Sequence, residues 1–126
     1  MKKVALLVCI IFVISCKKES QEAFGQPNPT ELSQTPEQLG KSIFEGKGNC
    51  VACHKINEKL VGPSILDIAK IYKVQNGDIV SFLKEDAKPL VDPTQYEVMK
   101  TNFALTKAMS DEELKGLEAY MFSDIK

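Results

Sequence analysis

Two thiols and an imidazole stand within one five-residue run of this sequence, Cys50-Val51-Ala52-Cys53-His54. Thiolate and imidazole groups bind metals such as zinc, and a pair of thiols can also take part in thiol–disulfide exchange. The chain contains one histidine and four cysteines. A site built from several histidines is therefore excluded, and the chemistry of this run depends on the sequence around it.

Three chemistries use such a run. A zinc site would need further Cys or His ligands, and the sequence after residue 34 has none outside the run. A dithiol oxidoreductase would be expected on a strand–helix–strand scaffold, for which no pattern is present. The third chemistry is covalent attachment of haem, whose signature is C-x-x-C-H. One helical turn then separates the thiols by the distance between the two porphyrin vinyl groups, and the following histidine is held under the iron. The run therefore favours haem bonded to Cys50 and Cys53 and ligated by His54.

The first fifteen residues predict a signal peptide. Lys2 and Lys3 precede the apolar run 4–14, which has the length of a signal-peptide core and is short for a membrane span. The run ends in Ser15-Cys16 and resembles the lipobox of bacterial lipoproteins. That resemblance implies cleavage before Cys16, lipidation of this cysteine, and an exported protein anchored to a bacterial membrane on the periplasmic side. An ordinary secretory signal, or a short anchor, with an incidental cysteine is the alternative.

The chain divides into three parts on this interpretation. Residues 1–15 are the lipoprotein signal peptide, residues 16–34 are the lipidated N-terminus with a polar, flexible tether, and residues 35–126 form one folded domain. The formal net charge is −1, with 26% charged residues and no arginine. Nucleic acid is not expected as a partner, because phosphate binding needs clustered positive charge.

Residues 35–126 predict an all-α domain of four to five short helices. Cap signals and apolar spacing place the helix starts after Thr35, near Ile65, after Asp78, after Asp92 and after Ser110. No sustained strand alternation occurs. A core made from so few helical residues is thin, since ordering each residue costs about 1–2 kcal/mol. A large apolar cofactor in the middle of the domain would make up the shortfall.

With this motif and these helices, residues 35–126 resemble the class I c-type cytochromes of the short bacterial monohaem type. Gly40 and Phe44 match the small and aromatic pair of that family's first helix. Leu117 and Tyr120 match the residues of the last helix against which the pair packs. The resemblance implies the small class I fold, with its N- and C-terminal helices packed together around one haem c per chain.

The resemblance also implies how the histidine ligand is oriented. Gly62-Pro63 follows His54 by the short loop that bacterial members show. In the family the carbonyl of this proline accepts the ring N–H of the ligand histidine. Such an acceptor fixes the imidazole tautomer and makes the other nitrogen a better donor to iron.

The second axial ligand is expected to be a methionine, because the chain has no second histidine. The candidates in the C-terminal half are Met99, Met109 and Met121. Met99, expected in a loop beyond a short helix, corresponds to the ligand of the family. Asn102 falls where some short bacterial members place an asparagine beside the ligand sulfur. One departure is that this chain has Lys100 after Met99, where many members have proline, which predicts a looser methionine loop.

The implied function is electron transfer rather than enzymatic catalysis. With His54 and Met99 both bound, the iron offers no open position to a small-molecule substrate, and its remaining chemistry is a one-electron change. The implied partners are redox proteins, such as membrane respiratory complexes, oxidases or reductases, and the membrane through the lipid anchor. A haem sensor or peroxidase-like protein with a weak or absent Met ligand is the alternative. A third interpretation is a lipoprotein with a dithiol and no haem.

Two features of the site stay open at this point. Lys47, Lys55 and Lys59 flank the attachment run and form either a local basic rim or an ordinary solvated surface. Trp and Arg, common partners of haem propionates, are absent. The remaining candidates for the propionate end are Tyr72, Tyr96, Lys84 and Lys88, and the sequence favours none of them.

Overall fold

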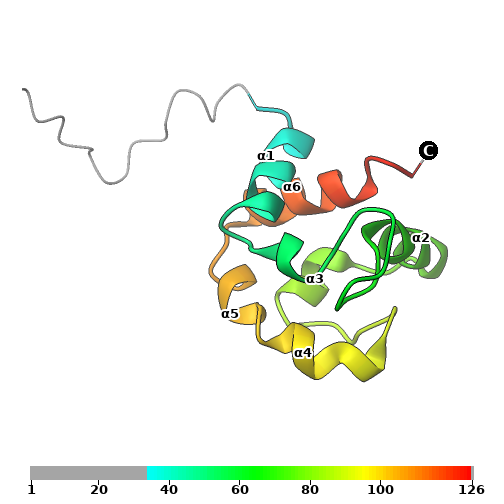
Figure 1. Ribbon diagram of the computed structural model, residues 1–126. Coiled ribbons are helices and arrows are strands. Elements are labelled where there is room, and N and C mark those ends of the chain that lie inside the picture. The colour runs from blue at the N-terminus through cyan, green and yellow to red at the C-terminus, as the bar shows by residue number, and fades with distance from the viewer. Residues whose placement is uncertain (1–33, 126) are drawn as a thin grey trace, which may run out of the picture.

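The computed structural model describes residues 34–125, and every regular element in that range is helical (Figure 1). The all-α class is therefore confirmed. The elements are α1 (Pro36–Glu45), η2 (Cys50–Ala52), α2 (Ile65–Gln75), α3 (Ile79–Leu83), η3 (Pro93–Gln95), α4 (Tyr96–Lys100), α5 (Phe103–Thr106) and α6 (Asp111–Phe122), where η marks a 3-10 turn. No helix in these residues is long and apolar enough to cross a membrane. The predicted signal peptide, Cys16 and residues 16–33 of the predicted tether lie outside the described residues.

Helix α1 begins with the predicted capping box. The Thr35 hydroxyl accepts a hydrogen bond from the backbone N–H of Gln38 at 3.3 Å, and the Gln38 side chain accepts one from the backbone N–H of Thr35 at 3.0 Å. The helix ends at Gly46, whose N–H donates to the carbonyl of Ser42. Its buried face carries Ile43 and Phe44, which belong to the core cluster.

Helix α6 begins in the same way, with Ser110 and Glu113 forming a second capping box. Glu113 also pairs with Lys47, which lies in the loop that follows α1. The hydrogen bond from Lys47 is the main cause that holds the pKa of Glu113 below its usual value. The ion pair therefore ties the segment before the attachment run to the start of the last helix.

The first and last helices cross at two glycines (Figure 1). A Cβ atom added at Gly40 would lie 1.9 Å from the carbonyl oxygen of Gly116, so only glycine permits this approach. Next to the crossing, the rings of Phe44 and Tyr120 pack with centroids 5.4 Å apart. The predicted packing of the N- and C-terminal helices is confirmed, and it brings Leu117 into the core at 1% exposure.

Helix α3 follows its predicted cap signal, whereas α2 has a cap that was not predicted. The hydroxyl of Ser64 accepts from the N–H of Asp67 at the start of α2, and the carboxylate of Asp78 accepts from the N–H of Ser81 at the start of α3. Between them, Asn76 ends α2 in the left-handed conformation with φ of 50°. The two helices are therefore joined by a tight turn.

The segment after Asp92 forms the predicted helical turns, as the 3-10 turn η3 followed directly by α4. The Asp92 carboxylate makes no cap hydrogen bond to the backbone; it accepts from the hydroxyl of Thr94 at 2.5 Å and pairs with Lys59. Helix α4 starts at Tyr96 and contains Met99, which was expected in a loop.

Helix α5 was not expected, and with it the described residues contain six α-helices instead of four to five. At four residues, α5 is too short to show a periodic signal. Its last residue, Thr106, is fully buried and donates from its hydroxyl to the carbonyl of Leu83 at 2.6 Å. That bond fixes the end of α5 against the end of α3.

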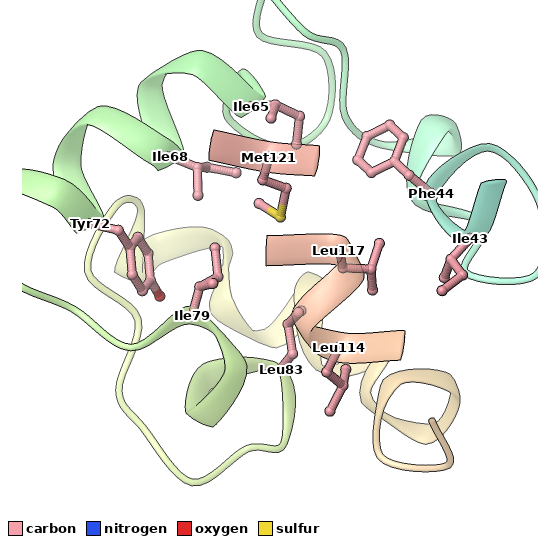
Figure 2. Packing of buried hydrophobic residues seen from close by; sticks show 10 residues of the cluster. All are labelled: Ile43, Phe44, Ile65, Ile68, Tyr72, Ile79, Leu83, Leu114, Leu117 and Met121. Carbon is pink, nitrogen blue, oxygen red and sulfur yellow. The ribbon is translucent and has the colours of Figure 1, made fainter. Parts of the chain in front are cut away.

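The buried core is a single cluster formed by α1, α2, α3 and α6 (Figure 2). Its ten members are Ile43, Phe44, Ile65, Ile68, Tyr72, Ile79, Leu83, Leu114, Leu117 and Met121. All but Ile43 and Leu114 also line a cavity. The buried core therefore forms one wall of the cavity, and part of its apolar surface is not covered by other protein side chains.

Candidate functional site

The cavity is enclosed by residues from α1, α2, α3, α4 and α6 and from the loops between them. It has about 1190 Å³ of empty space when the part open to solvent at its mouth is included. Most lining side chains are apolar. Within residues 34–125 no lysine lines it, and Asp92 is its only carboxylate. Such a site suits a large apolar ligand with few polar groups.

Both thiols and the imidazole of the attachment run line this cavity. The run forms the 3-10 turn η2, in which the N–H groups of Cys53 and His54 both donate to the carbonyl of Cys50, at 3.1 and 2.9 Å. Asn49 enters the turn in the left-handed conformation with φ of 52°. The two cysteines are not joined by a disulfide, and burial raises the pKa of the Cys50 thiol to about 11.

The ring of His54 is fixed by a hydrogen bond from Nδ1 to the carbonyl oxygen of Pro63 at 2.8 Å. A carbonyl can only accept, so Nδ1 carries the hydrogen and the lone pair of the neutral imidazole is on Nε2. The geometry therefore leaves one ring nitrogen available as a ligand. This contact is the one expected from the sequence.

Gly62 packs directly against the same ring. A Cβ at this position would lie 2.4 Å from Cε1 of His54 and 2.9 Å from each ring nitrogen. The N–H of Gly62 donates to the carbonyl of Cys53 at 2.9 Å, which closes the loop between the run and Pro63. This role of Gly62 was not predicted, because a contact between two residues across a loop leaves no periodic signal in the sequence.

Two of the three candidate methionines line the cavity. Met99 reaches it from α4 and Met121 from α6, whereas Met109 is not among the lining residues. Met121 is 8% exposed and packs within the core cluster, and Met99 is half-buried. Asn102 also lines the cavity. Its amide Nδ2 donates to the carbonyl of Gly48 at 3.3 Å, so it connects the methionine segment to the residues just before Cys50.

The surface around the cavity mouth is more apolar than the sequence suggested. Val61 and Val98 line the cavity and are also 47% and 46% exposed. The three lysines near the run are each paired with a carboxylate, as Lys47–Glu113, Lys55–Glu58 and Lys59–Asp92. Their charges are therefore locally balanced, and the geometry favours the solvated surface over a basic rim.

The donor set fits haem better than a bare metal ion. In the described part of the chain no three His, Cys, Asp or Glu side chains come together to hold a metal. Two thiols, an imidazole nitrogen and a thioether instead surround one large apolar cavity. Thiols suit covalent attachment of a porphyrin, and imidazole and thioether suit its iron.

Comparisons with known proteins agree with this chemistry. A family model described as Cytochrome c matches residues 37–123. Cytochrome c-551 of Pseudomonas denitrificans is 43% identical over 49 residues, which cover 39% of this chain and 57% of that protein. Cytochrome c-551 of Pseudomonas aeruginosa is 32% identical over 84 residues, which cover 64% of this chain and 72% of that protein.

The contact between Gly62 and the His54 ring leads to a prediction for Gly62→Ala. The added methyl group overlaps the ring, so we expect the hydrogen bond to Pro63 to be lost and the free energy of unfolding of the haem-loaded protein to fall by about 1–3 kcal/mol. Denaturant titration measures the stability, and proton NMR of the reduced protein reports the His54 ring.

Val74→Ala is the control. Val74 lies on α2, is 82% exposed and is not among the residues that line the cavity. We expect it to leave the His54 resonances unchanged. Unaltered His54 resonances in Gly62→Ala would contradict the steric argument.

Proposed function

Because this chain belongs to the cytochrome c family and therefore binds haem c covalently, we propose that it carries single electrons through a haem attached at Cys50 and Cys53. The observation that carries the proposal is that both thiols and His54 line one apolar cavity. The bound haem supplies a reversible one-electron change at its iron. The residues of the chain determine how it is held and at what potential the change occurs.

His54 is proposed as one axial ligand through Nε2. The hydrogen bond from Nδ1 to Pro63 keeps the ring in one tautomer and one orientation. It also increases the electron density that Nε2 can donate. Gly62 supports this arrangement, because its lack of a side chain lets the loop lie against the ring.

Met99 is proposed as the other axial ligand. It lines the cavity from α4 and is only half-buried, so it packs against the core cluster without being one of its buried members. Thioether ligation favours the reduced state of the iron, and burial acts in the same direction because it penalises the more highly charged oxidised state. Asn102 would steady the Met99 segment through its hydrogen bond to Gly48.

Redox proteins are the proposed partners, with membrane respiratory complexes, oxidases and reductases as the class. The exposed valines at the cavity mouth and the locally balanced lysines offer a small apolar contact, which suits the small interfaces of electron-transfer encounters. A lipid anchor at Cys16 on the exported side of a membrane would raise the local concentration of the domain near such partners.

The decisive experiment is haem retention. The chain, produced together with c-type maturation machinery, is denatured in acidified organic solvent, and the absorbance of haem is followed. We expect the absorbance to stay with the polypeptide, since thioether bonds survive this treatment. Cys50→Ser/Cys53→Ser should lose it. Haem that washes out of the wild-type protein would refute attachment at these cysteines and leave them as a dithiol.

Met99→Ala tests the second ligand. We expect the oxidised iron to become high-spin while the haem stays attached, as measured by visible absorption and electron paramagnetic resonance. Met109→Ala, which removes a methionine that is not among the lining residues, should stay low-spin. Asn102→Ala should also stay low-spin but bind added imidazole more tightly, because the methionine segment is less firmly held.

An unchanged low-spin spectrum in Met99→Ala would assign the ligand elsewhere, with Met121 as the next residue to replace. The sensor or peroxidase-like alternative requires an open or easily opened iron. It would be supported instead if carbon monoxide bound rapidly to the reduced wild-type protein.

Cys16→Ser tests the anchor. In a bacterial host we expect the wild-type protein in the membrane fraction and the variant in the soluble fraction, because the variant lacks the thiol that carries the lipid. Metabolic labelling with a radioactive fatty acid gives an independent measurement. A wild-type protein that is unlabelled and soluble would rule out lipidation.

A further inference from the structure

Tyr72 brings a phenol hydroxyl to the buried wall of the site. The residue lies on α2, is 3% exposed and is one of the residues that line the cavity. In Figure 2 its ring extends away from the α2 ribbon, with the hydroxyl at the far end. A polar group in such a place needs a hydrogen-bond partner, because burial without one is costly.

The direction of this hydroxyl is set by the packing of the ring. A Cβ at Gly77 would lie 2.7 Å from Cδ1 of Tyr72, so the backbone of the turn after α2 lies against the ring. The ring of Phe82 packs edge-on against it, with centroids 6.3 Å apart and an interplanar angle of 60°. The ring is therefore held in place by its neighbours and not by a hydrogen bond of its own.

No protein group in residues 34–125 accepts a hydrogen bond from the Tyr72 hydroxyl. The carboxylate of Asp78, whose charge acts on Tyr72, accepts from the N–H of Ser81 at 2.9 Å and from its hydroxyl at 2.6 Å. In the same residues no side-chain polar atom is both sealed from solvent and without a partner. The hydroxyl therefore retains access to open space, and the space beside this buried residue is the cavity.

The hydroxyl is a donor under all ordinary conditions. Burial, together with the negative charge of Asp78, raises the pKa of Tyr72 to about 12. The phenol stays protonated up to that pH, so a ligand in the cavity meets an O–H group and not an anion.

We propose that the Tyr72 hydroxyl donates a hydrogen bond to a propionate carboxylate of the bound haem. Apart from its iron centre, haem is apolar except for its two propionates, so these are the acceptors available to a donor in the cavity. The chain has no arginine and no tryptophan, and no lysine of residues 34–125 lines the cavity. Neutral donors are therefore what this site has for stabilising a carboxylate. Asn49, Gln95, Thr101 and Asn102 also line the cavity, but they are exposed or half-buried, whereas Tyr72 is buried.

Tyr96 is the other tyrosine that lines the cavity, and it is less suited to this role. It is only half-buried, and Lys100 lies over its ring with Nζ 5.5 Å from the centroid. Its surroundings are therefore partly hydrated, and water can serve any carboxylate there. Tyr72 combines full burial, a fixed ring and an unused hydroxyl.

The inference rests on the proposed function, and Tyr72→Phe tests it in the haem-loaded protein. Phenylalanine keeps the ring and removes only the hydroxyl. Without the donor, the propionate charge is less delocalised and stabilises oxidised iron more. We expect the redox equilibrium to shift about threefold toward the oxidised form, which corresponds to a midpoint potential lower by about 30 mV, at 59 mV per tenfold change. The propionate bending band in the resonance Raman spectrum should shift as well.

Tyr120→Phe is the matched control. Tyr120 also has a raised pKa and packs on a core phenylalanine, but it is not among the residues that line the cavity. We expect removal of the Tyr120 hydroxyl to leave the midpoint potential and the propionate band unchanged. If the Tyr72 hydroxyl had a purely structural role, Tyr72→Phe would change the free energy of unfolding but neither the midpoint potential nor the propionate band.

The wild-type protein provides a second measurement that needs no variant. Exchange from H₂O into D₂O should shift the propionate band, because the donated hydrogen is exchangeable, and the shift should be absent in Tyr72→Phe. A potential and a band that are the same in Tyr72→Phe and wild type would overturn the proposal while leaving haem binding intact. Failure of the proposed function itself would look different, since the wild-type protein would then hold no covalent haem.

Discussion

The close crossing of α1 and α6 at Gly40 and Gly116 is the constraint on which the rest of the structure depends. The backbones approach so closely that a single added methyl group would lie 1.9 Å from a carbonyl oxygen. The crossing fixes the direction of the chain as it leaves α1 toward Cys50. It also places Leu117 and Met121 of α6 against the cavity. The attachment run and one wall of the site are thus positioned by the same contact.

The core is shaped to be completed by a ligand. Most of its buried members face the cavity as well as one another, so the apolar surface they contribute is only partly covered by protein. Covering that surface is favourable by roughly 25 cal/mol for each Å² removed from water. The surface ion pairs, by contrast, join exposed side chains and contribute little to stability. In this domain the haem therefore serves as the central part of the hydrophobic core as well as the redox group.

Three polar side chains of the site have a defined role. The imidazole of His54 is oriented by Pro63, and the Asn102 amide connects the Met99 segment to Gly48. The Tyr72 hydroxyl has no protein acceptor among the described residues, and it is the donor we assign to the propionate. Because the cavity contains so little charge, a single hydrogen bond to a haem carboxylate would act in a low dielectric, which is why the proposal predicts a measurable effect on the potential.

The sequence by itself determined the all-α class, the caps of α1, α3 and α6, and the cofactor, because each depends on residues close together in the chain. The run from Cys50 to His54 is such a local signal, and so are the capping boxes at Thr35 and Ser110. The helical turns after Asp92 were also predicted, but Met99 was expected beyond them, and α5 was not expected because a four-residue helix has no period to detect. Only the tertiary structure decided that Gly62 lies against the His54 ring and that Met109 is not among the residues lining the cavity. It also decided that the Tyr72 hydroxyl has no protein acceptor among the described residues and lies beside the cavity. Each of these depends on which surfaces meet across the fold, and the packing of distant segments leaves no periodic trace in the order of residues along the chain.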